Sequence, residues 1–374
     1  MSKCKIVDTG LIYKNPKPHV KSIHAYFPSV VTMDNGEMLA TVVLGEAFEA
    51  LNNRTYIFRS KDNGKSWDLE GKIQAEKEGK ITSNFSRLTY LGAGELVIFM
   101  IRSDRTEHPE EGLTNPETLG FVPTELLLLR STDYGHSWKE PELIEPPLIG
   151  PAFEICCPIV VLSDGKWIIP TSTWHDWDGR CPNGLRMIGL ISYDNGRSWP
   201  EYMNVMYSQE RRIYFWESKI VELKDGRLLA AAWVYDDNAK SDRPNHYAIS
   251  SDGGRTWSKP KSMGIMGQTL TLYVLESGKI LCVYRRTDKQ GLWAIVCRVE
   301  GNELNIDGQW PLWGYGTEGL IGRSENMSHN FNVLKFGAPC ITETLTGELF
   351  VAFWCYEECI SVIRWIKVSI DENE

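Results

Sequence analysis

The sequence predicts an all-β protein, a β-propeller of six blades with four strands each. Two repeats predict this fold: an octapeptide that occurs four times, and a longer strand–turn–strand unit that occurs six times along the 374 residues. Repeats at a regular period are the sequence signature of propellers and solenoids. The composition agrees, because short β-branched and aromatic runs bounded by Gly, Asp and Asn are typical of strands joined by tight turns.

The octapeptide has the pattern S-x-D-x-G-x-[ST]-W. Its copies are Ser60–Trp67, Ser131–Trp138, Ser192–Trp199 and Ser250–Trp257. Average residue usage predicts roughly 0.003 chance matches per chain, so four copies carry information. Asp and Ser oxygens accept hydrogen bonds inside a turn, Gly takes a positive φ, and Trp packs the turn against the strands. We therefore expect the four octapeptide aspartates to be structural and not catalytic.

The longer repeat is an apolar strand, a turn that ends in Gly, and a second apolar strand. Its copies begin at Phe27, Phe85, Cys157, Glu217, Thr269 and Ala338, and their turn glycines are Gly36, Gly94, Gly165, Gly226, Gly278 and Gly347. The glycines are 58, 71, 61, 52 and 69 residues apart, which suits one four-stranded blade with its loops. Six copies predict six blades in one domain over residues 1–374, with octapeptide turns in blades one to four.

The last blade is one strand short. Its own strands end at Ile360–Ile370, and the open edge needs a partner. We expect the N-terminal segment Lys5–Tyr13 to supply the missing strand and close the ring.

Charge and composition exclude several classes of protein. Lys and Arg number 40 against 49 Asp and Glu, so the net charge of −9 argues against a broad electrostatic grip on nucleic acid or on an anionic membrane. No apolar run approaches the ~20 residues of a membrane helix, and the N-terminus lacks the apolar stretch of a secretory signal, so we expect a cytoplasmic protein. The oligomeric state stays open.

Nine scattered cysteines without paired CxxC sets favour buried free thiols over zinc. The chain also has no Gly-rich phosphate loop. We therefore expect no metal and no cofactor.

Propeller topology sorts the polar residues between two faces. Ligands meet the face where the inner strands begin, together with the loops that join second and third strands, and the octapeptides should lie on the opposite face. The ligand face should receive His24, Tyr26, Glu46, Glu49, Asn84, Arg87, Arg102, Arg105, Glu154, His175, Asp176, Glu217, Asp236, Arg285, Arg286, His329, Tyr356 and Glu357. Each alone has a structural alternative, because loop carboxylates are usually solvated and surface ion pairs are weak. Glu217 stands out because it opens an inner strand, where an apolar residue would serve the core better.

With its four octapeptides and six blades, the sequence resembles the sialidase superfamily, whose six-bladed propellers carry these octapeptides as Asp boxes. The resemblance covers nearly the whole chain. It implies three arginines for a substrate carboxylate, a nucleophilic Tyr paired with a Glu, and an Asp as acid/base. The segment Trp216–Gly226 is similar to the one that carries the family's Glu, which maps to Glu217, and Arg285 or Arg286 matches one arginine.

The remaining family positions differ in this chain. Tyr26 stands at the first arginine, Ala232–Trp233 at another, and Ala338 at the nucleophilic Tyr, while the acid's loop offers Glu46 and Glu49. An ordinary retaining neuraminidase is therefore not expected.

Three functions are compatible with these residues. The favoured one is a glycoside hydrolase that removes a terminal sugar, acidic sugars included, with Glu49 as acid and Glu217 or Asp176 as the second carboxylate. The expected substrate-binding residues are Arg285, Arg286, Tyr26, His24, His175, Arg102 and Glu154. The alternatives are a uronate-glycan lyase in which His24, Tyr26 and His175 move the proton, and a non-catalytic glycan-binding propeller.

The longest insertion, Ser103–Pro123, carries five acidic residues. It either restricts the mouth of the propeller or contacts another subunit.

Overall fold

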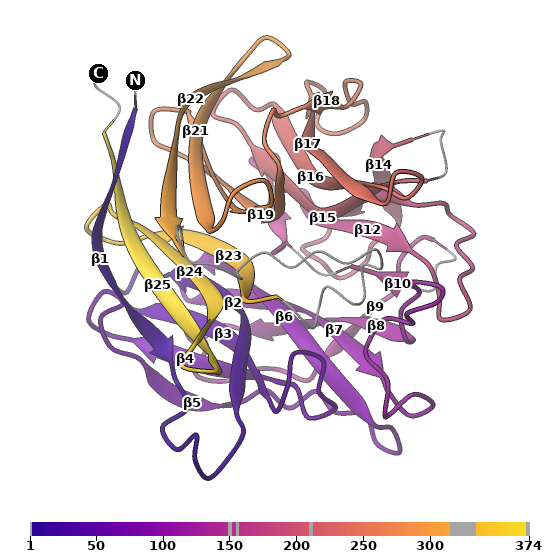
Figure 1. The fold of residues 1–374 in the computed structure, drawn as a ribbon, viewed down its shortest axis with the longest axis vertical. Coiled ribbons are helices and arrows are strands. Elements are labelled where there is room, and N and C mark those ends of the chain that lie inside the picture. The colour runs from indigo at the N-terminus through magenta and orange to yellow at the C-terminus, as the bar shows by residue number, and fades with distance from the viewer. Residues whose placement is uncertain (1, 149–151, 155–156, 209–211, 315–333, 372–374) are drawn as a thin grey trace.

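The computed structural model describes residues 2–148, 152–154, 157–208, 212–314 and 334–371. Six antiparallel sheets surround a central axis, which confirms the predicted six-bladed propeller (Figure 1). All regular elements in the described ranges are strands. Accordingly, no helix in this part of the chain is long and apolar enough to cross a bilayer.

Each blade runs from an inner strand at the axis to an outer strand at the periphery. Blade one consists of β2 (His24–Thr32), β3 (Met38–Gly45), β4 (Arg54–Ser60) and β5 (Asp68–Lys72), and blade two of β6 (Thr82–Gly92), β7 (Glu95–Asp104), β8 (Thr124–Ser131) and β9 (Glu142–Ile144). Blade three consists of β10 (Ala152–Phe153), β11 (Val160–Val161), β12 (Trp167–Trp174), β13 (Arg186–Ser192) and β14 (Glu201–Tyr207), and blade four of β15 (Ile213–Glu222), β16 (Leu228–Asp236), β17 (Ser241–Ser250) and β18 (Lys261–Ser262). Blade five consists of β19 (Gly267–Val274), β20 (Ile280–Arg286), β21 (Leu292–Glu300) and β22 (Glu303–Trp313), and blade six of β23 (Phe336–Glu343), β24 (Leu349–Glu357), β25 (Ile360–Asp371) and β1 (Lys3–Tyr13).

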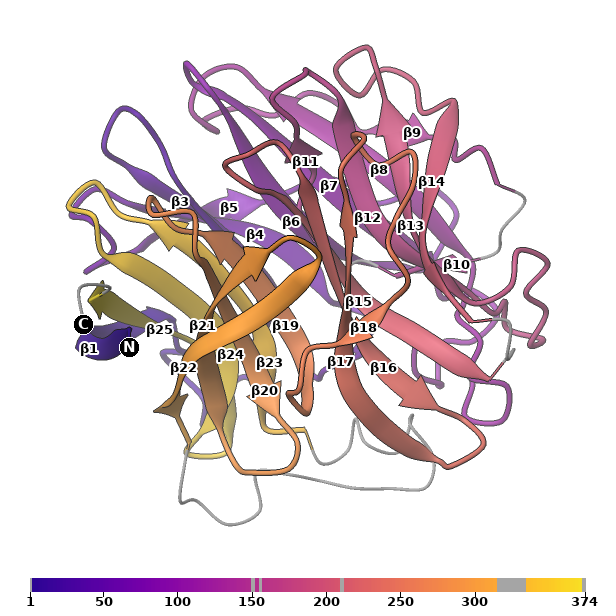
Figure 2. The same ribbon diagram turned by 90° about the horizontal axis from the view of Figure 1, so that it is seen from above.

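The ring closes through the N-terminal strand. β1 pairs antiparallel with β25, from Lys3 opposite Asp371 to Tyr13 opposite Ile363, and becomes the outer strand of blade six. The perpendicular view shows the two ends of the chain together beside these strands (Figure 2).

The core lies between neighbouring blades, and the second strand of each blade is packed on both faces. In β7, Val97 and Phe99 pack toward blade three, whereas Ile98 and Met100 pack toward blade one. This period of two follows from the pleat of a strand. Each fully buried side chain of this kind contributes ~1.5–3 kcal/mol, so the blades hold one another in place around the axis.

The turns between first and second strands require glycine. All six turn glycines of the repeat have φ between 79° and 90°, a region that residues with a Cβ rarely adopt.

The octapeptides form the turns between third and fourth strands. In the first copy, the Ser60 hydroxyl donates to Asp62 at 2.8 Å, and the N–H and hydroxyl of Ser66 donate to the same carboxylate at 2.9 and 2.6 Å. The N–H of Gly64 donates to Ser60 Oγ at 2.8 Å. The other three copies repeat these hydrogen bonds. They lie on the same face as the glycine turns, because Asn63 donates to Thr346, beside the turn of blade six.

Candidate active site

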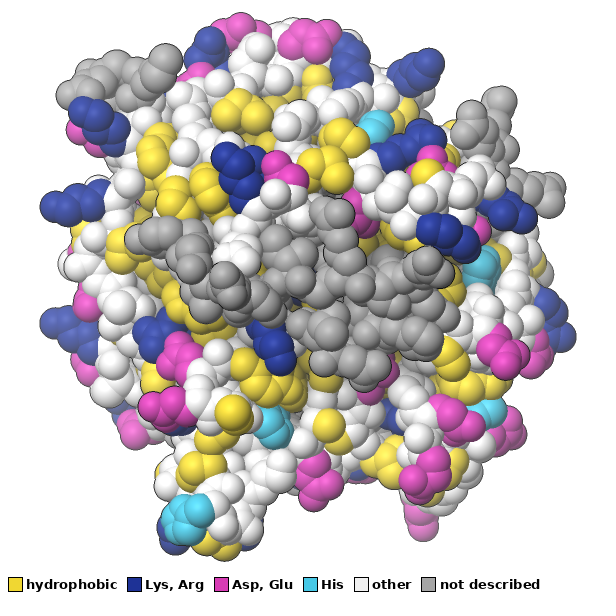
Figure 3. Space-filling view, viewed as in Figure 1, with side chains coloured by type: hydrophobic (Ala, Val, Ile, Leu, Met, Phe, Trp, Pro, Cys, Tyr) yellow, Lys and Arg dark blue, Asp and Glu magenta, His cyan; other side chains and the backbone are white. Residues whose placement is uncertain are grey.

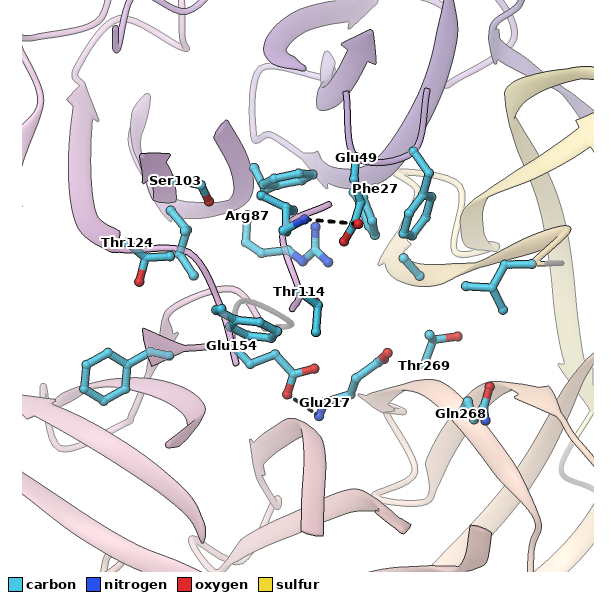
Figure 4. A pocket seen from close by; sticks show the side chains of 18 of the residues that line it. Phe27, Glu49, Arg87, Ser103, Thr114, Thr124, Glu154, Glu217, Gln268 and Thr269 are labelled. Atoms are coloured by element: carbon cyan, nitrogen blue, oxygen red, sulfur yellow. Dashed lines mark hydrogen bonds between the residues drawn. The ribbon is translucent and has the colours of Figure 1, made fainter. Parts of the chain in front are cut away.

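A cavity of about 200 Å³ receives side chains from all six blades (Figure 4). Its polar lining residues are Glu49, Arg87, Ser103, Thr114, Thr124, Glu154, Glu217, Gln268, Thr269 and Arg285. No octapeptide residue is among the described residues that line it. The cavity therefore lies on the side of the propeller away from the octapeptide turns.

Four inner strands carry the same irregularity at the cavity. In each, pairing with the second strand skips two residues, and the first of the two has a positive φ. These residues are Phe27 (50°), Glu217 (52°), Thr269 (48°) and Ala338 (48°), and all four line the cavity. Such a backbone costs about 1–3 kcal/mol and is found mainly at functional sites. The same four residues open their copies of the longer repeat, so the register of the repeat marks the site.

Glu154 and Glu217 form a pair of neighbouring carboxyl groups on one wall. The backbone N–H of Glu217 donates to Oε2 of Glu154 at 2.7 Å. Burial, and after it the charge of Glu217, raises the pKa of Glu154 to about 8. Burial also raises the pKa of Glu217, against the nearby charges of Lys219, Arg285 and Arg87. Burial therefore favours the protonated form of Glu154 near neutral pH, whereas three nearby cations oppose protonation of Glu217.

Arg285 is fixed beside this pair by a chain of hydrogen bonds. Its Nη1 donates to the carbonyl of Phe336 at 2.8 Å, and its Nη2 donates to Oε1 of Gln268 at 2.6 Å. Gln268 in turn donates through Nε2 to Asp242 at 2.9 Å. The guanidinium is thus oriented before any substrate arrives.

Glu49 reaches the cavity from the loop after β3. The N–H of Leu113 donates to its Oε2 at 3.1 Å, and Nη1 of Arg105 donates to its backbone carbonyl at 2.9 Å. Burial raises the pKa of Glu49 to about 7, although the Leu113 hydrogen bond and the charge of Arg105 lower it. Glu49 is therefore a second group poised to exchange a proton near neutral pH.

The insertion between β7 and β8 forms part of the cavity wall. It contributes Leu113, Thr114, Phe121 and Val122. On its other side it is held by the loop after β12: Asn115 Nδ2 and Thr118 Oγ1 donate to the carbonyl of Trp177 at 3.0 and 2.8 Å. Of the two roles left open for this loop, its position supports restriction of the mouth.

Six predicted site residues do not line the cavity. They are Asp176, His175, Arg102, Arg286, Tyr26 and His24. They lie at the end of the strands where the cavity is found, but the direction of each side chain is set by local partners.

Asp176 and His175 make hydrogen bonds in the loop after β12, which holds the insertion that forms part of the cavity wall. Asp176 accepts from the N–H and Nε of Arg180 at 2.8 and 2.9 Å. Burial opposes the effect, but these bonds lower the pKa of Asp176. Its carboxylate therefore closes a loop and does not line the cavity. Nδ1 of His175 lies 3.0 Å from the carbonyl of Thr118.

Arg102 and Arg286 form ion pairs outside the cavity. Arg102 donates to Glu125 at 2.8 and 2.7 Å. Arg286 donates to Asp288 at 2.6 and 2.9 Å and lies 4.5 Å from the ring centre of Trp293. Only Arg285, of the two adjacent arginines, points into the cavity.

Tyr26 and His24 pack behind the cavity wall. The Tyr26 hydroxyl lies 2.9 Å from that of Tyr356, and Nδ1 of His24 accepts from the N–H of Ser361 at 3.0 Å. The lyase hypothesis therefore has none of its three proton-carrying residues in the cavity. His329 lies outside the described residues.

Sequence reasoning missed two aspects of the site. The sequence predicts only substrate binding for Glu154, because its pairing with Glu217 arises from a tertiary contact between residues 63 apart in sequence. Gln268 and Thr269 were not singled out, although Thr269 shares the repeat position of Glu217.

The lining offers carboxylates but no imidazole or thiol among the described residues. Within those residues, no group of three or more His, Cys, Asp or Glu side chains is arranged to hold a metal ion. The eight described cysteines are free. Charged side chains of both signs are spread around the face seen in Figure 3.

The chain matches no known sequence family and no curated protein. Its fold is similar to that of a protein of unknown function from Dyadobacter fermentans, with a TM-score of 0.72 and 18% identity over 98% of this chain and 99% of the other. It is also similar to the Trypanosoma rangeli sialidase, with a TM-score of 0.62 and 16% identity over 92% of this chain and 55% of that one. A third similar structure is the intramolecular trans-sialidase from Ruminococcus gnavus, with a TM-score of 0.62 and 13% identity over 93% and 94% of the two chains. The protein thus has a sialidase-like propeller fold, which does not by itself fix the reaction.

Proposed function

We propose that the protein is a glycoside hydrolase that removes one terminal sugar from an oligosaccharide, with Glu49 and Glu217 as its carboxyl pair. The observation that carries this proposal is that two half-buried carboxyl groups, from blade one and blade four, lie on opposite sides of one cavity (Figure 4). Glycosidic cleavage requires an acid for the leaving oxygen and a second carboxylate that acts as base or nucleophile.

Glu49 is assigned as the acid. Its pKa of about 7 leaves a proton available at neutral pH, close to the optimum for a general acid. Glu217 is assigned as the second carboxylate. Burial and the charge of Glu217 favour the protonated form of Glu154, while the charges of Lys219 and Arg285 oppose protonation of Glu217. Ionised Glu217 can stabilise the positive charge that develops on the sugar ring.

No tyrosine is among the described residues that line the cavity. This favours a direct role for the carboxyl groups over a phenol nucleophile. The cavity volume of about 200 Å³ is below the roughly 300–1,000 Å³ of drug-sized ligand sites, which supports a single terminal sugar.

The test is turnover of a panel of nitrophenyl glycosides and end-labelled oligosaccharides. Glu49→Gln and Glu217→Gln should each lower kcat by at least ~100-fold. Asp176→Asn, which removes a carboxylate beside the site but outside the cavity, is the matched control and should keep wild-type turnover. Release of an unsaturated uronate would favour the lyase instead, and binding without turnover would favour a glycan-binding protein.

A further inference from the structure

The two sides of the cavity differ in chemistry. One side carries the rings of Phe27, Phe48, Phe85 and Trp354, from blades one, two and six. Phe27 lies 5.1 Å from Phe48 and 5.3 Å from Phe85 between ring centres, and Phe48 lies 5.4 Å from Trp354. We call these four residues the aromatic wall.

The opposite side is polar. Blades three, four and five contribute Glu154, Glu217, Gln268, Thr269 and Arg285. Thr269 is only 8% exposed, yet its hydroxyl has no hydrogen-bond partner among the described residues. That oxygen is itself enclosed, so the carboxyl groups of Glu154 and Glu217 are the acceptors that this side offers to sugar hydroxyls.

The contrast is built at one repeated backbone position. The residue at the strained bulge is apolar in blades one and six, where it is Phe27 and Ala338, and polar in blades four and five, where it is Glu217 and Thr269. A bulky aromatic residue is especially unusual at positive φ. Phe27 and Phe48 are only partly buried against the core behind them, so ring surface remains toward the cavity.

We propose that the cavity selects a sugar with an apolar substituent, of the 6-deoxyhexose class, whose methyl group contacts the aromatic wall while its hydroxyls face the polar side. This inference rests on the proposed function and names its substrate class. A hydroxymethyl group packed on the ring faces would bury its hydroxyl there unless it reached Arg87 or Glu49, which lie on the same side. Methyl groups and sugar C–H groups pack well on such rings.

An acidic substituent is the competing class, because Arg87 and Glu49 also lie on the aromatic side (Figure 4). Arg285, the other cavity arginine, already donates to Phe336 and Gln268. A substrate carboxylate would also share the cavity with three glutamates. These contacts favour the neutral methyl group over the carboxylate.

Sugars that differ only at C6 test the proposal. Two sets of three carry methyl, hydroxymethyl and carboxylate at C6: D-fucose, D-galactose and D-galacturonate, and D-quinovose, D-glucose and D-glucuronate. Two pairs compare methyl with hydroxymethyl alone: L-fucose with L-galactose, and L-rhamnose with L-mannose. Dissociation constants are measured by calorimetry or ligand-observed NMR. In the configuration that binds best, the 6-deoxy sugar should bind at least ~10-fold more tightly than its hydroxymethyl partner. Equal affinities, or tightest binding of a uronate, overturn the inference and leave the proposed function standing, whereas no binding by any sugar overturns both.

Variants of the aromatic wall test whether its rings cause the preference for a 6-deoxy sugar. Phe27→Asn places an amide in the wall, and Asn is among the residues best tolerated at positive φ. It should abolish the preference for the methyl group. Ala93→Asn is the matched control, since Ala93 also has φ of 50° but lies exposed in a turn on the opposite face. Phe48→Leu, which makes no demand on the backbone, is the second variant, and an unchanged preference in both wall variants contradicts the inference.

Discussion

The carboxylates of the octapeptide turns and those of the cavity are the same chemical group in opposite surroundings. Asp133 accepts from the hydroxyls of Ser131 and Ser137 at 2.7 and 2.6 Å and from the N–H of Ser137 at 2.9 Å. The Ser137 hydroxyl is the largest cause that lowers the pKa of Asp133 to about 2. Glu154 lies instead beside a second carboxylate, and burial raises its pKa to about 8.

The surroundings of each carboxylate decide what it can do in this repeated fold. A carboxylate saturated with donors stays ionised and stabilises a turn, whereas one buried beside a like charge exchanges its proton near neutral pH. The positions that repeat without change build the turns. The position at which copies differ, occupied by Phe27, Glu217, Thr269 and Ala338, lines the cavity.

We expect the greatest change on the face that carries the glycine and octapeptide turns, here called the turn face. Trp199 is 4% exposed and packs in the core between blades two and three. Trp199→Ala should lower the free energy of unfolding by ~3–5 kcal/mol, because it leaves a cavity where a large ring was. Urea unfolding measures this loss, and turnover per folded molecule should not change. A variant of normal stability that has lost activity would reverse our assignment of the two faces.

The second prediction concerns turnover and the cavity residue Glu217. Glu217→Gln is nearly isosteric, so the fold and ligand binding should persist. Turnover should fall by at least ~100-fold, which corresponds to ~2.7 kcal/mol in the activation barrier. Steady-state kinetics checks this. If kcat stays within a few-fold of wild type, Glu217 only anchors Arg285, and Glu49 with Glu154 becomes the leading pair.

The sequence predicted the blades well and the site in part, for a physical reason. Strand–turn periodicity is local, so the glycine turns and octapeptides can be recognised without tertiary information. Topology then placed Glu49, Glu217 and Arg285 at the ligand face. It could not tell that Arg286 turns away to Asp288, because adjacent strand residues point in opposite directions and only the packing decides which one faces the cavity.

The third effect concerns the pH dependence of stability. The pKa of Glu154 is raised in the folded state from 4.5 to about 8. Its contribution to the free energy of unfolding is therefore fully present below about pH 4.5 and is lost as the pH rises toward 8. One such proton changes the free energy of unfolding by at most ~1.4 kcal/mol per pH unit. Glu154→Gln should flatten the decline of stability between these limits.

Thermal unfolding followed across this pH range measures the slope. Asp176→Asn is the control, because burial is outweighed by the Arg180 contacts that lower the pKa of Asp176, and it should leave the alkaline slope unchanged. Equal slopes in wild type and Glu154→Gln would show that Glu154 does not hold a proton across this pH range.

The smallest expected effect returns to the turn face and has the opposite sign. The pKa of Asp133 is lowered from 3.8 to about 2. Its contribution to the free energy of unfolding is therefore present above about pH 4 and is lost as the pH falls toward 2. Ser137→Ala removes one donor and should destabilise the protein at neutral pH by ~0.5–1.5 kcal/mol, with a weaker loss on acidification. Ser137→Thr is the matched control, since Thr256 makes the same hydrogen bond at 2.6 Å in the fourth octapeptide. Urea unfolding at neutral and acid pH compares the two variants. If Ser137→Ala and Ser137→Thr behave alike, this hydroxyl does not hold Asp133 in its ionised form, and the Ser131 hydroxyl and the Ser137 N–H are the donors that do.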